Sequence, residues 1–263
     1  MEGAGAAAAT GITLRENYKL ITKMDSKKDA AIKIIHSDVE KMAELILGQL
    51  RELENIFSSE ELKISREKLE NFARAEKKID NFEIKISDEF INIVCLHNPV
   101  ASELRKIITC YRLSINLERI GDIAQKVLRI LSEMKRQDKI AAFMDETSSM
   151  MIMTNNMVEK SILSFFNNDI DYAIWTLKND DVIDKINRKM VKKILKKNLA
   201  DIDDQDVQNN FFNIKTIVSN IERIADHSTN IAEASIYYLK GKDVRHTDIS
   251  DLISGLEENS PAK

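Results

Sequence analysis

The chain has 263 residues, of which seven are glycine and two are proline, whereas average usage would give about 32 of the two together. Tight β-turns depend on glycine for positive φ and on proline for a preset φ, so this composition excludes a protein built from many short strands. Hydrophobic residues form 43% of the chain, charged residues form 31%, and the net charge of −4 provides no basic field that would attract nucleic acid.

The 3.6-residue period of the apolar side chains predicts six long helices joined by short corners. In chain order they are expected at about 28–57, from a cap at Ser58 or Ser59 to Leu96, at 99–134, at 139–166, from a cap at Asp169 to Leu199, and from the polar corner 201–206 to Gly241. Because short corners make sequential helices antiparallel neighbours, we expect an all-α fold of two tandem three-helix bundles.

An internal repeat supports this organisation. The segment 116–122 matches 220–226 at an offset of 104 residues, with five of the seven residues identical. The two bundles are therefore expected to be two copies of one unit. The predicted divisions are a flexible N-terminal extension (1–26), the first repeat (27–136), the second repeat (137–241) and a polar C-terminal tail (242–263).

Each repeat carries two acidic pairs at i, i+4, a spacing that places both carboxylates of a pair on one helix face. The pairs are Glu76 with Asp80, Glu118 with Asp122, Asp180 with Asp184, and Glu222 with Asp226. Any one pair alone is typical of a solvated acidic face. All four recur in register with the repeat, however, and they border the apolar stripes of their helices.

A bound cation would relieve the repulsion between such pairs on neighbouring helices. Ligand sets made only of oxygen suit Mg²⁺, Ca²⁺, Mn²⁺ or iron better than structural zinc. Arg119 and Arg223 could compensate part of the charge, although each points about 100° away from the preceding glutamate. The sequence therefore predicts one carboxylate-rich metal site in each repeat.

Three segments resemble signatures of the PhoU family of bacterial phosphate-signalling proteins, and the resemblance covers about residues 28–240. The segments are 98–105 (NPVASELR), 117–122 (LERIGD) and 222–233 (ERIADHSTNIAE). The resemblance implies two three-helix bundles that bind metal ions, often iron clusters, through paired acidic motifs. Manganese, magnesium, calcium and zinc remain alternatives to iron.

The resemblance also implies a non-enzymatic, cytoplasmic regulator that restrains phosphate uptake and phosphate-regulon signalling. Its expected partners are the ATPase subunit of the phosphate ABC transporter and the phosphate-sensing histidine kinase, and a homodimer is expected. The two repeats differ in one respect: His227 and Asn230 follow Asp226, whereas Ile123 and Lys126 follow Asp122. If His227 and Asn230 orient the carboxylates by hydrogen bonds, the first site lacks that support.

A basic stripe on the fifth predicted helix has two interpretations. It consists of Arg188, Lys189, Lys192, Lys193, Lys196 and Lys197. Cations near a helix C-terminus oppose the helix dipole, which explains the stripe without a ligand. The alternative is a contact with an acidic partner or with an anionic membrane surface.

Two other functions compete with the metal-binding adaptor. A di-metal carboxylate oxidase on a helical bundle would use Glu-x-x-His on two helices, and this motif is absent from the sequence. A metal-free helical scaffold is the other alternative.

The sequence also favours a location in the cytoplasm. No stretch reaches the roughly 18 apolar residues of a membrane span, and the start does not resemble a signal peptide. The two cysteines have no metal or redox spacing, as is typical of a cytoplasmic protein.

Overall fold

The computed structural model describes residues 14–59, 64–134, 138–196, 204–245 and 247. This part of the chain contains six helices and no strand. In order they are α1 (Leu14–Ser58), α2 (Arg66–His97), α3 (Ala101–Glu133), α4 (Asp138–Phe166), α5 (Ile170–Leu195) and α6 (Gln205–Lys240). The expected all-α fold of six long helices is confirmed.

The helix ends follow from local side-chain chemistry. Asp169 caps α5 as expected, because its carboxylate accepts from the backbone N–H groups of Asp171 and Tyr172, and Asp204 caps α6 in the same way. Such caps satisfy backbone donors that the first helical turn leaves without partners. Gly241 ends α6 with φ of 69°, a left-handed conformation that glycine adopts without steric cost.

Two expected boundaries were wrong. Helix α1 begins at Leu14 and not near Lys28, because no glycine or proline lies between Leu14 and Gly48. Residues 14–26, expected within the flexible extension, are therefore helical, while residues 1–13 lie outside the described part. The cap of α2 is Ser65 and not Ser58 or Ser59. Ser59 instead donates its hydroxyl to the Ile56 carbonyl at the end of α1. The expected end of α5 at Leu199 lies outside the described residues.

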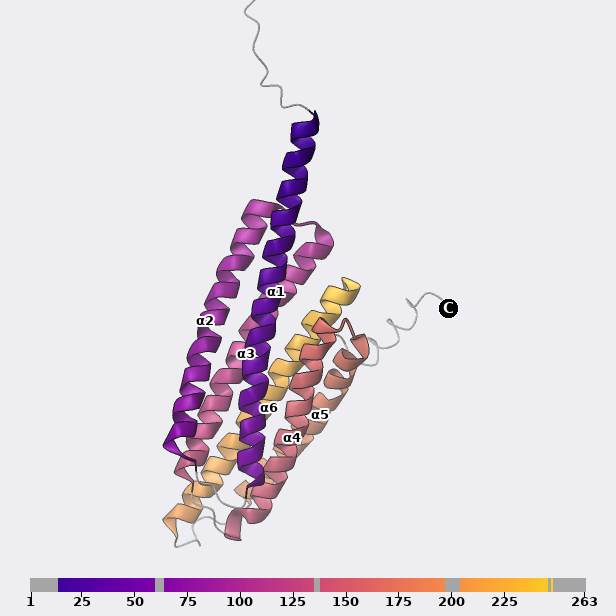
Figure 1. Ribbon diagram of the computed structural model, residues 1–263. Coiled ribbons are helices and arrows are strands. Elements are labelled where there is room, and N and C mark those ends of the chain that lie inside the picture. The colour runs from indigo at the N-terminus through magenta and orange to yellow at the C-terminus, as the bar shows by residue number, and fades with distance from the viewer. Residues whose placement is uncertain (1–13, 60–63, 135–137, 197–203, 246, 248–263) are drawn as a thin grey trace, which may run out of the picture.

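The six helices form one elongated body in which α2 and α5 lie on opposite sides (Figure 1). Helix α2 packs mainly against α1 and α3, and α5 packs mainly against α4 and α6. The two repeats contact each other where α1 packs against α4 and where α3 packs against α6. One apolar core extends across both repeats, from Ile35 and Ile46 to Ile217 and Ile224.

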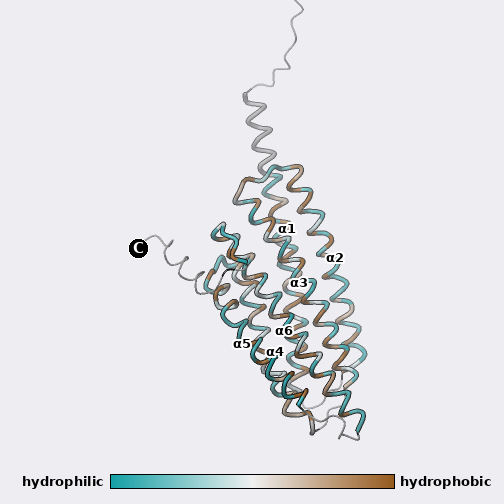
Figure 2. The backbone as a smooth tube through the Cα atoms, turned by 180° about the vertical axis from the view of Figure 1, so that it is seen from behind, coloured by the Kyte–Doolittle hydropathy of each residue, from teal (hydrophilic) through white to brown (hydrophobic). Residues whose placement is uncertain are grey.

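Hydrophilic and hydrophobic residues alternate along each helix (Figure 2), as expected for helices that bury one face. Within the described residues, no helix combines the length and the apolar character that a membrane crossing requires.

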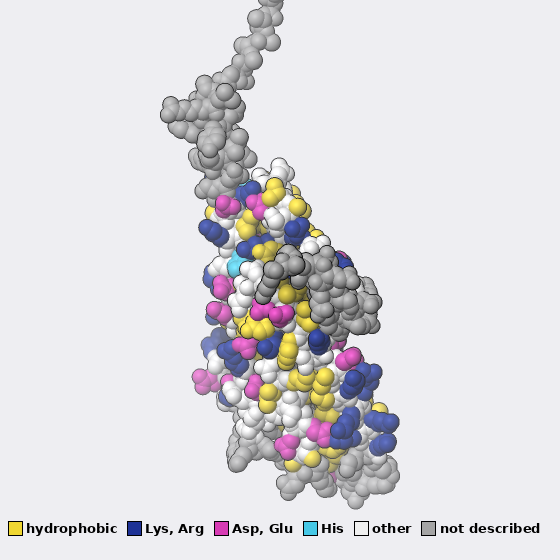
Figure 3. Space-filling model, turned by 90° about the vertical axis from the view of Figure 1, so that its right-hand side faces the viewer, with side chains coloured by type: hydrophobic (Ala, Val, Ile, Leu, Met, Phe, Trp, Pro, Cys, Tyr) yellow, Lys and Arg dark blue, Asp and Glu magenta, His cyan; other side chains and the backbone are white. Residues whose placement is uncertain are grey.

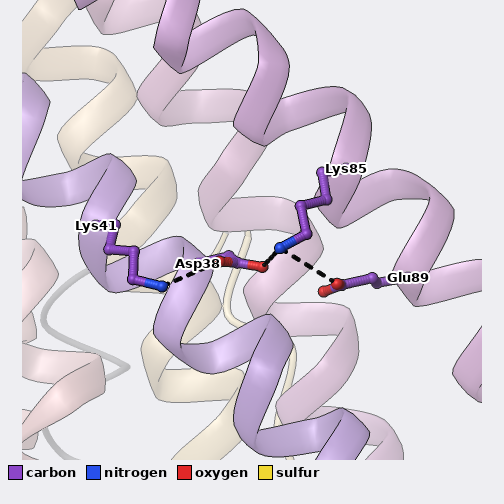
Figure 4. A network of polar contacts seen from close by, with 4 residues as sticks. All are labelled: Asp38, Lys41, Lys85 and Glu89. Carbon is purple, nitrogen blue, oxygen red and sulfur yellow. Dashed lines mark hydrogen bonds and ion pairs between the residues drawn. The ribbon is translucent and has the colours of Figure 1, made fainter.

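A buried charge joins α1 to α2 in the first repeat (Figure 4). The Asp38 side chain is 3% exposed, and its Oδ2 lies 2.6 Å from Lys85 Nζ. Lys41 Nζ lies 3.5 Å from Oδ1, and Lys85 also reaches Glu89 at 3.7 Å. Two lysines therefore offset the charge of the buried Asp38 carboxylate.

Candidate metal centres

The structure brings three of the four predicted carboxylates of each repeat together. The first triad is Asp80 on α2 with Glu118 and Asp122 on α3, and the second triad is Asp184 on α5 with Glu222 and Asp226 on α6. In each triad one carboxylate oxygen from every residue lies within 4.8 Å of the other two. Both triads thus lie between an outer helix and an inner helix, at positions related by the repeat.

The fourth predicted residue of each repeat lies outside its triad. Glu76 Oε2 accepts a hydrogen bond of 2.7 Å from Gln125 Nε2 on α3, so that an amide is its partner. Gln125 was missed by the sequence analysis, although its position three residues after Asp122 places it near the acidic face of α3. In the second repeat, Asp180 Oδ1 is buried and has no hydrogen-bond partner among the described residues.

Burial and mutual repulsion disfavour the charged carboxylates in both repeats. Burial, with the neighbouring Asp122, raises the pKa of Glu118, and burial, with Asp226 and Asp184, raises the pKa of Glu222. Burial also raises the pKa of Asp226, to which Asp184 contributes. The pKa of Asp180 rises to about 6, chiefly through burial and then through the charges of Asp226 and Asp184. In the second repeat, the negative charge of the clustered carboxylates therefore exceeds what the neighbouring arginines offset.

The arginines near the triads compensate this charge only in part. Arg188 Nη2 lies 3.0 Å from Asp184 Oδ2 and forms the one ion pair to a triad carboxylate among the described residues. Arg119 lowers the pKa of Glu118, opposing the stronger effect of burial, and Arg223 acts likewise on Glu222. Both arginines are exposed, as expected from their place on the adjoining face of each helix.

Among the described residues, neither His227 nor Asn230 forms the expected hydrogen bond to a triad carboxylate. His227 Nδ1 instead lies 3.0 Å from Asn116 Oδ1 on α3, because the residue after Asp226 points about 100° away from it around the helix. Asn230 is exposed and lines a polar hollow that it shares with Asn116 and Arg112. The two residues therefore belong to the contact between the repeats.

The basic stripe divides into side chains with different partners. Arg188 contacts Asp184, and Lys193 forms an ion pair with Glu146 on α4. Lys189 is exposed, Lys192 and Lys196 line a groove between α5 and α6, and Lys197 lies outside the described residues.

The donor atoms of the triads fit a hard cation. All three ligands of each triad are carboxylates, the donors that Mg²⁺, Ca²⁺, Mn²⁺ and iron accept readily. The unpartnered Asp180 oxygen supplies a further acceptor beside the second triad. A cation there would stabilise the ionised form of every one of these groups.

The sequence of this chain matches a known protein family over most of its length. A profile described as the PhoU domain matches residues 39–131 and 147–235, which together exceed half of the chain. A phosphate-specific transport system accessory protein PhoU homolog of Pseudomonas aeruginosa is 29% identical over 181 residues, or 69% of this chain and 74% of the relative. PhoU homolog 1 of Thermotoga maritima is 28% identical over 232 residues, which cover 86% of this chain and 93% of the relative.

Solved structures share the arrangement of helices. The crystal structure of PhoU from Pseudomonas aeruginosa superimposes with a TM-score of 0.71 at 24% identity, covering 81% of this chain and 99% of that one. The phosphate transport system regulatory protein PhoU from Streptococcus pneumoniae gives a TM-score of 0.63 at 20% identity over 82% of this chain and 99% of that one. With two copies of the domain on a fold of six helices, this chain belongs to the PhoU family.

Proposed function

We propose that this protein is a metal-binding regulatory adaptor of phosphate transport. The observation that carries the proposal is the recurrence of a carboxylate triad at matching positions of both repeats. Like charges brought within 4.8 Å of one another are unfavourable unless a cation lies among them. A solvated acidic face would not need to converge twice in the same register.

The adaptor acts on phosphate uptake and phosphate-regulon signalling, and it acts negatively. Relatives from Thermotoga maritima and Escherichia coli carry the name phosphate-specific transport system accessory protein, which supports this assignment. The proposed partners are the ATPase subunit of the phosphate ABC transporter and the phosphate-sensing histidine kinase. The adaptor is proposed to be a cytoplasmic homodimer that carries out no catalysis.

Asp184, Glu222 and Asp226 would hold the ion in the second repeat, and Asp80, Glu118 and Asp122 would hold it in the first. Iron is the favoured ion, because the resemblance to the family adds to the oxygen-only ligand set. Asp180 would provide a further oxygen ligand beside the second triad, whereas a Glu76 oxygen already accepts a hydrogen bond from Gln125. The second repeat is therefore expected to bind the ion more tightly.

Elemental analysis of purified variants tests the metal sites. Glu222→Ala with Asp226→Ala should remove the ion of the second repeat while the helical content stays unchanged, and Glu118→Ala with Asp122→Ala should remove the ion of the first. Glu40→Ala with Glu44→Ala is the matched control, because it deletes an exposed i, i+4 acidic pair from α1. Wild-type metal content in the first two variants would contradict the assignment of the two sites, and purified wild-type protein without metal would favour the metal-free scaffold.

A pull-down at high and low phosphate tests the adaptor role. The protein should retain the transporter ATPase subunit or the sensor kinase, and retention should change with the phosphate concentration. Binding to neither protein under either condition would contradict the adaptor role whatever the metal analysis gives.

A further inference from the structure

A groove runs between α5 and α6 next to the second triad. It encloses about 450 Å³, and its lining includes Lys192 and Lys196 on α5, Lys215 on α6, and the apolar side chains of Val191 and Leu195. The Leu195 side chain is 66% exposed. Phe212 is 54% exposed and continues the face of α6 that carries Lys215, because the two residues are three positions apart.

The lining of the α5–α6 groove carries cations and no carboxylate. Lys192, Lys196 and Lys215 take part in no ion pair within the described part of the chain. Arg188, which also lines the groove, is engaged with Asp184. Figure 3, which faces the side of α5, shows Lys and Arg side chains gathered low on this face. Three positive charges on two walls therefore lack a negative partner among the residues that the structure describes.

The first repeat has no cation at the positions that correspond to these lysines. At the offset of 104 residues, Lys192, Lys196 and Lys215 correspond to Asp88, Asn92 and Tyr111. Leu195 corresponds to Ile91, which is also exposed, at 54%. The apolar position is shared by both repeats, whereas the cations occur only in the second. The helix dipole accounts for cations near the C-terminus of α5, but it does not account for Lys215, which lies inside α6 on the other wall of the groove.

We propose that the α5–α6 groove binds an acidic amphipathic helix of a partner protein, an inference that rests on the proposed adaptor function. The apolar ridge of that helix packs on Val191 and Leu195, and its carboxylates on either side meet Lys192 and Lys196 on one wall and Lys215 on the other. This is the usual mode in which a helix lies in an apolar groove with charged margins. Charge complementarity of this kind also speeds association and selects among partners.

The shape of the site favours a protein helix over a membrane. The cations line both walls of a concave surface, and a flat layer of headgroups would reach only the rim. A helix laid along the groove can contact the lysines of both walls and the apolar side chains of Val191 and Leu195 on α5.

Fluorescence anisotropy with designed peptides tests the proposal. The probe is a labelled helix with leucine on one face and glutamate on the others, and its counterpart carries lysine in place of glutamate. Wild-type protein should bind the acidic peptide and not the basic one. The variant Lys192→Glu, Lys196→Glu, Lys215→Glu should bind the acidic peptide about ten-fold more weakly or worse, since each substitution replaces an attraction by a repulsion.

The control variant Lys27→Glu, Lys33→Glu, Lys78→Glu changes the net charge equally at exposed positions of α1 and α2. It should keep its affinity within about two-fold, because exposed charges beyond a Debye length are screened. Equal losses in both variants, or no preference for the acidic peptide, would overturn the proposal. Vesicles of phosphatidylglycerol and phosphatidylcholine that bind through the three groove lysines, when the peptide does not bind, would assign the surface to a membrane instead.

The partner pull-down separates this proposal from the adaptor function. If wild-type protein binds the ATPase subunit or the kinase and the groove variant binds equally well, the groove assignment fails while the adaptor function stands. If wild-type protein binds neither partner, the adaptor function fails. If the groove variant alone loses its partner and keeps its metal and its helical content, both proposals are supported.

Discussion

His227 on α6 and Asn116 on α3 form a polar contact between the two repeats, with Nδ1 lying 3.0 Å from Oδ1. Asn116 Nδ2 already donates to the Arg112 carbonyl, so Oδ1 is the acceptor and His227 carries its proton on Nδ1. Asn220, the repeat equivalent of Asn116, donates to the Thr216 carbonyl in the same way. The equivalent of His227, however, is Ile123, so the contact exists once and makes the interface between the repeats asymmetric.

The burial of His227 at this contact makes stability depend on pH. Burial, and then the charges of Arg119 and Arg223, lower the pKa of His227 from 6.5 to about 4. The unfolded chain therefore binds one more proton between these values. The stability that the neutral ring provides is complete above pH 6.5 and is lost as pH falls toward 4. His227→Gln keeps a neutral donor toward Asn116, so it should lose less stability than wild type over this range. Urea unfolding of both proteins across these pH values measures the difference, and parallel curves would contradict the prediction.

Asp180 gives the opposite dependence in protein stripped of metal by EDTA. Its folded pKa of about 6 lies above the ordinary 3.8, so the stability associated with its neutral form is present below pH 3.8 and is lost as pH rises through 6. Asp180→Asn should therefore stabilise the metal-free protein at pH 7 by about 1 kcal/mol, a value discounted for the part of the side chain still in contact with solvent.

The gain from Asp180→Asn should vanish in acid, where the wild-type carboxyl is already protonated. Urea midpoints in EDTA at neutral and acidic pH check both statements. A variant that is less stable than wild type at pH 7 would contradict the account of repulsion in the second repeat.

Two glycines provide a matched pair of substitutions with opposite expected signs. A Cβ at Gly121 would lie 3.0 Å from Ile46 Cδ1 and 3.4 Å from Ile79 Cδ1, whereas one at Gly48 would meet nothing within 4 Å. Gly48→Ala should stabilise the protein by about 0.5–1 kcal/mol through helix propensity. Gly121→Ala should lose that gain and more, with a net cost of about 1 kcal/mol, because overpacking a buried interface strains its neighbours. Chemical denaturation of both variants measures the signs, and stabilisation by Gly121→Ala would show that Ile46 moves freely.

Asp38 should depend on Lys85 much more than on Lys41. Lys85 Nζ lies 2.6 Å from the buried carboxylate and Lys41 Nζ lies 3.5 Å from it, while the two lysine side chains are similarly exposed, at 51% and 57%. Lys85→Met should cost about 2 kcal/mol, because the remaining lysine only partly neutralises the buried charge. Lys41→Met should cost less than about 1 kcal/mol, as exposed pairs do. Thermal or urea unfolding compares the stabilities of the two variants. Equal losses of stability would contradict the larger role given to Lys85.

Much of the site could be predicted because it depends on spacing along single helices. The pairs Glu118 with Asp122 and Glu222 with Asp226 share a face by helical geometry alone, and the repeat indicated the helices that oppose them. Glu76 could not be assigned in this way, since its partner Gln125 comes from another helix. The partner of His227 likewise comes from the other repeat, and no spacing within either repeat specifies how α3 and α6 meet.

The sequence by itself determined six helices, a twofold repeat and two clusters of acidic residues, because helical periodicity and capping are local properties of a chain with so few helix breakers. Residues such as Asp169 and Gly241 act within one turn, so their roles could be inferred without the fold. Only the tertiary structure decided that a single core joins the repeats, that α2 and α5 lie outside it, and that Lys215 meets Lys192 across a groove. Those relationships depend on how helix faces distant in sequence pack together, and the same local pattern is compatible with more than one such packing.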